Sequence, residues 1–404
     1  MISYSYVRII IRSALALCFL FGLKKTYIYF THNQEPQIQL QGLDENHAYA
    51  DSINCTLALK NKTSIKFLDA KLNGKPCDIE SKKIIGKSEV EHLFSIDTTL
   101  LEDGKHTFAL KAVDSTYNKN SRSIKIPFTV DNKILQASFL QDKYNINQGR
   151  TARVTFNTNK ELSSANIAYL SKQYNCCKVT PYGSMYECFI PIECDQDSEE
   201  HQIIATLTDS TGKSITLHNN ISVNTVEFPK QKGFKVAQEK IQDEKDVSLS
   251  NSILKTALHR WLEKSPTEKL WKGIFDLPCQ VTRYSTPFGE IRVTPERGRY
   301  LHKAVDIVHT PRSVIWASAR GKVIIKDRYL MSGNTVVLEH GMGVHSLYYH
   351  LHDFADIEVG DVIGKGVKIG RMGKTGYATG YHLHWEVRIN NVAVDPLEWT
   401  EKWT

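Results

Sequence analysis

Apolar and polar residues alternate along residues 35 to about 225, which is the pattern of strands that bury one face. Segments such as KHTFALKAV and SRSIKIPFTV show it, with turn residues between them. The pattern repeats, because HTFALKAVDST begins at His106 and HQIIATLTDST begins at His201. The number of residues between these two starting points is about the length of one immunoglobulin-like (Ig-like) domain. We therefore predict two tandem Ig-like β-sandwich domains, residues 35–131 and 132–226. No partner motif accompanies the two histidines, and we interpret both as structural.

The pattern changes over residues 227–269, which are charged and helix-prone. Leu254, Leu258 and Leu262 recur at helical spacing, so we predict a helical linker whose leucine stripe docks on the rest of the protein.

From residue 270 to residue 404 the pattern returns to short strands, such as KVIIK, NTVVLEH and SLYYHL, separated by glycine-rich turns. This leaves little room for helix and favours an antiparallel sheet that curls into a groove or half-barrel. The predicted fold class is therefore mostly β, with two sandwiches, a helical linker and a C-terminal β groove.

Residues 1–34 contain the apolar run VRIIIRSALALCFLFGLKK. Its uninterrupted core has the length of a signal-peptide core, and the whole run nearly reaches the length of a membrane span. No A-x-A cleavage site follows, and Leu17 stands before Cys18 where a lipoprotein signal needs a small residue. We therefore favour an uncleaved signal anchor in the inner membrane over a signal that is cleaved before secretion. Either way the remaining residues reach the cell envelope, in the periplasm or outside the membrane.

Composition adds two restraints. The net charge of +7 is mild and the chain has no long basic run, so nothing indicates a nucleic-acid partner, whereas an anionic wall or membrane surface is compatible. The 8 cysteines lack zinc-ribbon spacing, and each predicted sandwich contains an even number of cysteines. We therefore favour disulfides of an exported protein over buried free thiols.

Histidine is concentrated near the C-terminus, because more than half of the 15 histidines lie between His302 and His384. The stretch HKAVDIV places His302 and Asp306 on one face of a predicted strand, and HLHWEV places His382 and His384 on one face of another. The stretch YYHL adds His350 on a third strand. If these strands are neighbours, five side chains of the types that bind metals face one groove.

Two histidines and an aspartate suit a catalytic zinc ion, which takes three protein ligands and keeps a fourth position for water. Such a site lowers the pKa of the bound water to about 7, and nearby imidazoles can take its proton and stabilise an oxyanion. Spacing alone does not decide which imidazole of H-x-H is the ligand. A single histidine on a strand is usually a polar surface residue, and we interpret His309, His340, His345 and His352 in that way.

Residues 270–400 resemble the lysostaphin/LytM-type zinc metallopeptidases, which cleave peptide cross-links in peptidoglycan. The motifs that carry the resemblance are LWKGIFDLP, STPFGEIR, HKAVDIV, ASARGKVII, SGNTVVLEHGMGVHSLYYHL, VGDVIGKGVKIGRMGKTGYATGYHLHWEV and DPLEW. The resemblance implies one zinc ion bound by His302, Asp306 and His384. It also implies that His350 and His382 orient the water and stabilise the transition state.

The chain departs from the family pattern at two positions, since Ala304 stands for the usual glycine and Tyr381 for a common proline. Some members use a tyrosine upstream of the first zinc histidine, and Tyr300 is the candidate here. These departures concern groove shape and specificity rather than zinc.

The resemblance implies a zinc-dependent endopeptidase that hydrolyses peptide cross-links of bacterial peptidoglycan, with zinc-activated water as nucleophile and peptidoglycan peptide stems as partner. The alternative is a non-catalytic wall-binding protein or an activator of another wall hydrolase, as in degenerate members that lack ligands. All five positions are filled here, which favours the enzyme. A structural zinc site in an adhesin-like protein is disfavoured because no cysteine lies near these motifs.

Overall fold

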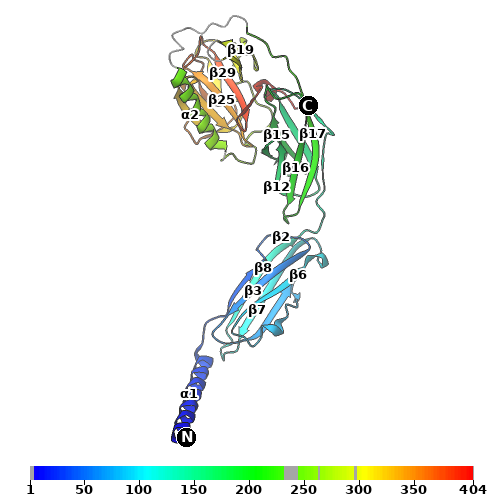
Figure 1. Cartoon of the computed structure of the whole chain (residues 1–404), viewed down its shortest axis with the longest axis vertical. Coiled ribbons are helices and arrows are strands. Elements are labelled where there is room, and N and C mark those ends of the chain that lie inside the picture. The colour runs from blue at the N-terminus through cyan, green and yellow to red at the C-terminus, as the bar shows by residue number, and fades with distance from the viewer. Residues whose placement is uncertain (1–3, 232–243, 263, 295–297, 404) are drawn as a thin grey trace. The chain divides into compact units, whose positions relative to one another are not determined.

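The computed structural model describes residues 4–231, 244–262, 264–294 and 298–403 (Figure 1). Its contacts separate two compact units, Met1–Ile134 with Asp209–Lys213, and Leu135–Thr208 with Ser214–Thr404. Strands dominate both units, and the mostly β fold class is confirmed. The five domain boundaries given above remain predictions.

The first unit contains a sandwich of two sheets. One sheet has the order β1 (Gln37–Gln41), β3 (Ser52–Lys60) and β6 (Glu89–Asp97). The other has the order β2 (Ala48–Tyr49), β8 (Ser121–Val130), β7 (Gly104–Asp114), β4 (Ile65–Leu72) and β5 (Lys75–Pro76). Every second residue of β3 from Ile53 to Leu59 is buried, and these side chains share one core with Phe108 and Phe128 of the second sheet.

Helix α1 (Tyr4–Thr31) precedes this sandwich. Within it, Arg12–Thr31 is long and apolar enough to cross a membrane, and none of that stretch is buried. The helix end contacts a loop of the sandwich. The Tyr117 amide donates a hydrogen bond to the Tyr29 carbonyl at 3.0 Å, and the Phe30 and Tyr117 rings lie 5.5 Å apart. Such a helix is compatible with an anchor or with a signal sequence.

A second sandwich opens the second unit. One sheet has the order β10 (Tyr144–Asn147), β17 (Ser214–Asn224), β16 (Glu200–Asp209), β12 (Leu162–Tyr169) and β13 (Lys172–Asn175). The other has the order β14 (Cys177–Lys178), β15 (Met185–Pro191), β11 (Thr151–Thr158) and β9 (Ala137–Phe139).

The sequence repeat corresponds to a repeated turn. In the first sandwich the buried carboxylate of Asp114 accepts hydrogen bonds from the amide and hydroxyl of Thr116, and in the second Asp209 accepts the same two bonds from Thr211. Each sandwich also pairs a short strand in parallel with its last strand, β2 with β8 and β10 with β17. The two sandwiches therefore share local architecture, and their Ig-like type remains a prediction.

The C-terminal region folds around one curled antiparallel sheet. Its order is β18 (Arg283–Thr286), β21 (Val305–Val308), β29 (Leu383–Ile389), β25 (Val344–Leu351), β24 (Gly333–Glu339), β23 (Gly321–Tyr329) and β27 (Val362–Ile363), with β30 (Val392–Val394) on β29. A small sheet, β22 (Val314–Trp316), β28 (Lys368–Arg371) and β26 (Asp353–Phe354), and a hairpin, β19 (Ile291–Thr294) and β20 (Gly298–Leu301), complete it. The predicted groove-like sheet is confirmed.

The two faces of this sheet differ. Val305, Trp385 and Tyr348 lie in the main hydrophobic core on one face. The intervening residues, which include Asp306 and His384, point to the other face.

Helix α2 (Glu244–Leu262) covers part of that other face, beside β25 in Figure 1. Its buried Leu254 and Leu258 pack with Ile325 of β23, Val337 of β24 and Tyr349 of β25 in a separate core. The predicted docking of the leucine stripe is confirmed for these two leucines. The Leu262 side chain lies outside the described residues.

The second sandwich and the C-terminal sheet share a core. Phe189 of β15 lies 5.7 Å from the Trp271 ring and 5.5 Å from the Trp399 ring. The buried Glu187 carboxylate beside it pairs with Arg153 at 2.8 Å and with Lys269. These parts of the second unit therefore pack as one body.

The predicted disulfides are not present, because the structure describes all eight cysteines and each is a free thiol. Five of them are buried: Cys55, Cys177, Cys188, Cys194 and Cys279. Burial raises the pKa of Cys177, Cys194 and Cys279 to about 12. These thiols act as small apolar residues of the cores, which even numbers of cysteines do not reveal.

Candidate metal centre and catalytic groups

Three side chains of metal-binding type converge on the groove face of the sheet. His302 Nε2 lies 3.2 Å from Asp306 Oδ1 and 3.2 Å from His384 Nδ1, and His384 Nδ1 lies 2.9 Å from Asp306 Oδ1. Asp306 of β21 stands directly opposite His384 of β29 in the antiparallel register, which explains how two distant segments meet. All three are largely buried, so water competes little with their interactions.

The local prediction for His302 was wrong in one respect, because His302 and Asp306 do not share a strand. Strand β20 ends at Leu301 and β21 begins at Val305, so His302 lies on the connection between them. Its backbone amide donates to the Glu290 carbonyl at 2.9 Å, and its carbonyl accepts from the Gly289 amide at 2.8 Å. Backbone pairing with the neighbouring turn, rather than strand alternation, aims this imidazole at Asp306.

The donor set fits a divalent zinc-type ion. Two imidazole nitrogens and one carboxylate oxygen, all within 4.8 Å of one another, leave a single point that all three atoms can reach. His302 donates Nδ1–H to the Pro287 carbonyl at 3.4 Å, because a carbonyl can only accept, so Nε2 is the atom that faces the cluster and is available to a metal ion.

His350 and His382 lie beside this cluster, with ring centroids 4.9 Å apart. His350 donates Nδ1–H to the Thr375 carbonyl at 2.8 Å, and His382 donates Nδ1–H to the Gly380 carbonyl at 3.0 Å. The His382 Nε2 atom lies 3.9 Å from Asp306 Oδ1. Each imidazole therefore keeps a free Nε2 lone pair.

Burial sets the protonation of these groups. It lowers the pKa of His350 to about 3 and also lowers the pKa of His382, so both are neutral at pH 7. Burial opposes charge on His384 too, but hydrogen bonds to Asp306 and Glu386 outweigh it and raise its pKa to about 9. Burial would raise the pKa of Asp306, but hydrogen bonds from His302 and His384 hold it well below its usual range.

His350 reaches the groove through an unusual backbone conformation. It lies in β25 with φ of 61°, in the left-handed region that costs a residue with a Cβ roughly 1–2 kcal/mol. Such strain concentrates at functional sites, where the surrounding structure maintains it. Here the His350 amide is tied to the Ser332 carbonyl at 2.8 Å.

Sequence reasoning missed two groups that contact the cluster. Glu386 lies two residues beyond His384 on the same face of β29, and its Oε1 is 3.1 Å from His384 Nε2. The same alternation that places His382 and His384 on one face also places Glu386 and Arg388 there, so the sequence pattern could have predicted Glu386. Arg292 comes from the β19–β20 hairpin, 3.7 Å from Asp306 Oδ2, and no sequence pattern connects the two.

The interpretation of isolated histidines as surface residues was wrong for His340 and His345. His340 is buried and lies 2.7 Å from Ser346 Oγ through Nε2, and His345 is buried 2.6 Å from Glu339. Both rings lie beside polar groups within the fold, which favours their burial. His309 and His352 are partly exposed.

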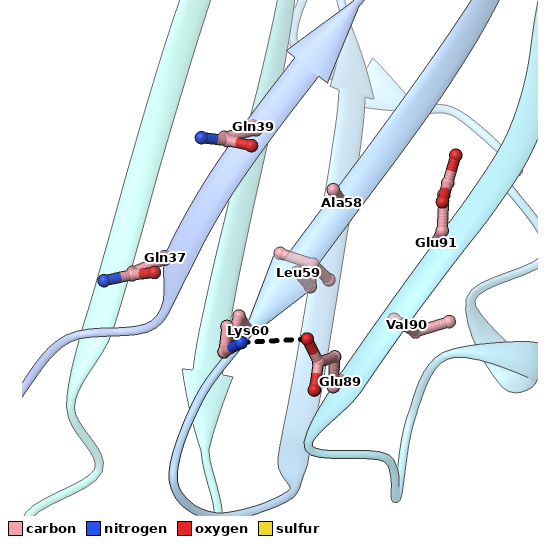
Figure 2. A pocket seen from close by; sticks show the side chains of 8 residues that line it. All are labelled: Gln37, Gln39, Ala58, Leu59, Lys60, Glu89, Val90 and Glu91. Atoms are coloured by element: carbon pink, nitrogen blue, oxygen red, sulfur yellow. Dashed lines mark hydrogen bonds and ion pairs between the residues drawn. The ribbon is translucent and has the colours of Figure 1, made fainter.

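A hollow elsewhere contains none of these groups. It has a volume of about 500 Å³ and lies over β1, β3 and β6 of the first sandwich, where Lys60 pairs with Glu89 at 3.0 Å (Figure 2). Its other lining residues are glutamines, Ala58, Leu59, Val90 and Glu91. It offers no nucleophile or metal ligand cluster.

Residues 300–396 match the family model described as "Peptidase family M23", and this range contains all five predicted site residues. The chain is 41% identical over 128 residues to the DD-carboxypeptidase/endopeptidase Mpg of Neisseria meningitidis serogroup B, covering 31% of this chain and 29% of that protein. It is 29% identical over 143 residues to the peptidoglycan DD-endopeptidase ShyB of Vibrio cholerae, covering 35% of this chain and 31% of that protein. The matches thus span less than a third of the length of these relatives.

Among solved structures, a peptidase M23 from Pseudomonas aeruginosa aligns over 63% of this chain and 94% of its own, with 23% identity and a TM-score of 0.47. The catalytic domain of lysostaphin from Staphylococcus simulans aligns over 35% of this chain and 96% of its own, with 24% identity and a TM-score of 0.23.

Proposed function

From a chain whose C-terminal domain is a peptidase family M23 domain, we propose that this protein is an endopeptidase that hydrolyses peptide cross-links of bacterial peptidoglycan. The observation that carries the proposal is the convergence of His302 Nε2, Asp306 Oδ1 and His384 Nδ1 beside two neutral histidines. Relatives named peptidoglycan DD-endopeptidases support the substrate class.

His302, Asp306 and His384 would hold one zinc ion. When bound, zinc would act as a Lewis acid toward the scissile carbonyl and lower the pKa of a bound water molecule to about 7. The carboxylate and two neutral imidazoles would leave a net positive site that suits this chemistry.

His350 and His382 would move the proton. Because each donates Nδ1–H to a backbone carbonyl, the free Nε2 atom can accept a proton from an attacking water molecule. A ring protonated in this way carries a new N–H, which can stabilise the oxyanion of the tetrahedral intermediate and then protonate the leaving amine. Their lowered pKa values keep both rings neutral at pH 7, so that neither Nε2 atom is already protonated.

For the cellular setting, we propose a cell-envelope protein anchored in the inner membrane by α1, with secretion after signal cleavage as the alternative. The peptide stems of peptidoglycan would be its substrate, and the first sandwich would be a spacer between membrane and wall. The second sandwich shares a hydrophobic core with the C-terminal sheet and would hold that sheet in place.

The test uses the full chain purified in detergent and incubated with peptidoglycan sacculi, with and without a chelator, beside His302→Ala. Mass spectrometry of the released muropeptides should show cross-linked dimers converted to monomers only by the metal-loaded wild type. Intact cross-links in a sample that contains one bound zinc ion per chain would refute the proposed substrate. Intact cross-links with no bound zinc would favour a non-catalytic wall-binding protein or an activator of another hydrolase.

A further inference from the structure

Glu386 is a buried carboxylate that none of the steps above uses. It lies on the groove face of β29, and only 4% of its surface is exposed. One oxygen lies 3.1 Å from His384 Nε2, and the other accepts a hydrogen bond from Arg388 Nε. Arg388 in turn donates to Asn391 Oδ1 at 2.9 Å. A buried ion pair is weak evidence for a role in stability, because apolar residues of similar volume often stabilise a core equally well. The series of contacts from His384 through Glu386 to Arg388 therefore needs another explanation.

The chemistry of the contact fixes the tautomer of His384. An ionised carboxylate can only accept a hydrogen bond, so Nε2 of His384 donates its N–H to Glu386, and Nδ1 is the atom that binds a metal ion when the ion replaces the Nδ1 proton. The Nδ1 atom faces Asp306 Oδ1 at 2.9 Å and His302 Nε2 at 3.2 Å. The Tyr349 ring, stacked on His384 at 5.1 Å and 5°, holds the plane of the imidazole.

We propose that Glu386 is a positioning residue that selects Nδ1 of His384 as the metal-binding atom, with Arg388 holding the carboxylate in place. The inference rests on the proposed metal site and extends it beyond the three ligands. Without the carboxylate, a neutral His384 can keep its single proton on Nδ1, where it points at the other two ligands and blocks the ion. Histidine ligands in proteins commonly donate their second N–H to such a partner, and its loss typically weakens metal binding about 10–100-fold.

The chain offers a matched control. Glu339 of β24 is also buried and pairs with a buried histidine, His345, at 2.6 Å, but it lies on another strand and contacts none of the three predicted ligands. Glu386→Gln keeps an acceptor oxygen for His384, whereas Glu386→Leu removes it. Glu339→Leu removes a comparable buried pair.

The experiment measures zinc affinity of the full chain by competition with a chromophoric chelator, and the unfolding midpoint of each metal-free variant. Zinc affinity should fall about 10–100-fold in Glu386→Leu and less in Glu386→Gln. Glu339→Leu should lower the unfolding midpoint while leaving zinc affinity within about twofold of wild type. Long-range ¹H–¹⁵N spectra of labelled histidine in the zinc-loaded wild type should show the His384 proton on Nε2 and none on Nδ1.

Unchanged zinc affinity in Glu386→Leu, or equal losses in Glu386→Leu and Glu339→Leu, would overturn the positioning role. A wild-type chain that binds no zinc would refute the metal site itself. A wild-type chain that binds zinc but cleaves no cross-link would refute the proposed substrate and leave the role of Glu386 measurable.

Discussion

The left-handed backbone of His350 is the residue-scale feature that most clearly separates catalysis from stability. A β-strand gains nothing from a non-glycine residue with φ of 61°, and glycine adopts that conformation without the cost of a Cβ. A functional role of the side chain accounts for the strained backbone. The ring centroids of His350 and His384 lie 5.8 Å apart, so the imidazole of His350 lies beside the predicted metal centre.

Replacing His350 by glycine should abolish most activity and keep both fold and metal. We expect turnover of cross-linked muropeptides to fall about 10²–10⁴-fold, the usual contribution of a general acid or base. Zinc content should stay at one ion per chain, because the three predicted ligands are untouched, and the unfolding midpoint should not fall. His352→Ala, two residues away and outside the cluster, should retain wild-type turnover. Loss of zinc from His350→Gly would contradict the assigned role.

At this scale the sequence predicted five of the groups that the structure brings together. A period of two explains the shared face of His382 and His384, whereas His302 lies on a connection and is aimed by backbone pairing. The same rule would have reached Glu386 and Arg388 had it been applied beyond His384. It could not find Arg292, which approaches Asp306 from a separate hairpin. It also misjudged His340 and His345, since a buried histidine with polar partners has the same local sequence pattern as an exposed one.

At the scale of elements, helix α2 packs on the C-terminal sheet, although it lies in the segment that the sequence predicts to be a linker. Its buried leucines pack on strands β23, β24 and β25, and they share Tyr349 with the predicted metal centre, because that ring also stacks on His384. Helical spacing predicted the docking face, but nothing in the sequence specified which strands would receive it. That choice depends on long-range packing.

Leu258→Ala should loosen this helix selectively. Leu258 is 2% exposed, and removing a buried leucine side chain costs about 2–5 kcal/mol. Hydrogen exchange should speed up along α2 and in the segments of β23 and β25 that it covers. The matched control is Ile253→Ala on the same helix, because Ile253 is exposed and its truncation should cost less than about 0.5 kcal/mol. Equal exchange in the two variants would mean that α2 does not dock as described.

At the scale of the second unit, the sandwich and the C-terminal sheet are joined by a buried acid. Glu398, in the short 3-10 helix Pro396–Thr400, accepts a hydrogen bond from the Thr151 hydroxyl of β11. Burial raises the pKa of Glu398 to about 8, against the lowering effects of Thr151 and Arg150. The neighbouring Asp395 also has a raised pKa, because of its burial. The sequence could not reveal this joint, since both partners look like ordinary surface residues.

Stability of this unit should therefore decline as pH rises. Between the ordinary glutamate pKa of 4.5 and about 8, the folded chain binds one more proton at Glu398 than the unfolded chain does. The stabilisation is complete below pH 4.5 and is lost toward pH 8, by at most about 1.4 kcal/mol per pH unit. Chemical denaturation from pH 5 to pH 8 should show the decline, and Glu398→Gln should flatten it. Glu401→Gln, an exposed neighbour, should leave it unchanged; an unchanged slope in Glu398→Gln would contradict the assignment.

At the scale of the first unit, α1 and its sandwich are joined through exposed aromatic residues. Tyr29, Phe30 and Tyr117 are all solvent-exposed, yet they contact one another through a backbone hydrogen bond and ring packing. When Arg12–Thr31 crosses the membrane, a rise of about 1.5 Å per residue places Tyr29 about 3 Å from the end of the span, next to the headgroup layer. Tyrosine rings are enriched in that layer, so an anchored α1 would place Tyr117 there.

Tyr117→Trp should therefore report on the anchor. In the full chain reconstituted in vesicles of lipids brominated near the headgroup, the added tryptophan emission should be strongly quenched relative to unbrominated vesicles, with wild type subtracted for its 6 tryptophans. Leu100→Trp is the control, because exposed Leu100 precedes β7 while Tyr117 follows it, and the 11 residues of that strand separate the two by about 35 Å. Its emission should be unaffected. Equal quenching at both positions, or none at Tyr117→Trp in a membrane-bound chain, would refute this placement. A chain recovered without its first residues and free of the vesicles would instead show that α1 is a cleaved signal, because only an intact α1 holds the sandwich at the bilayer.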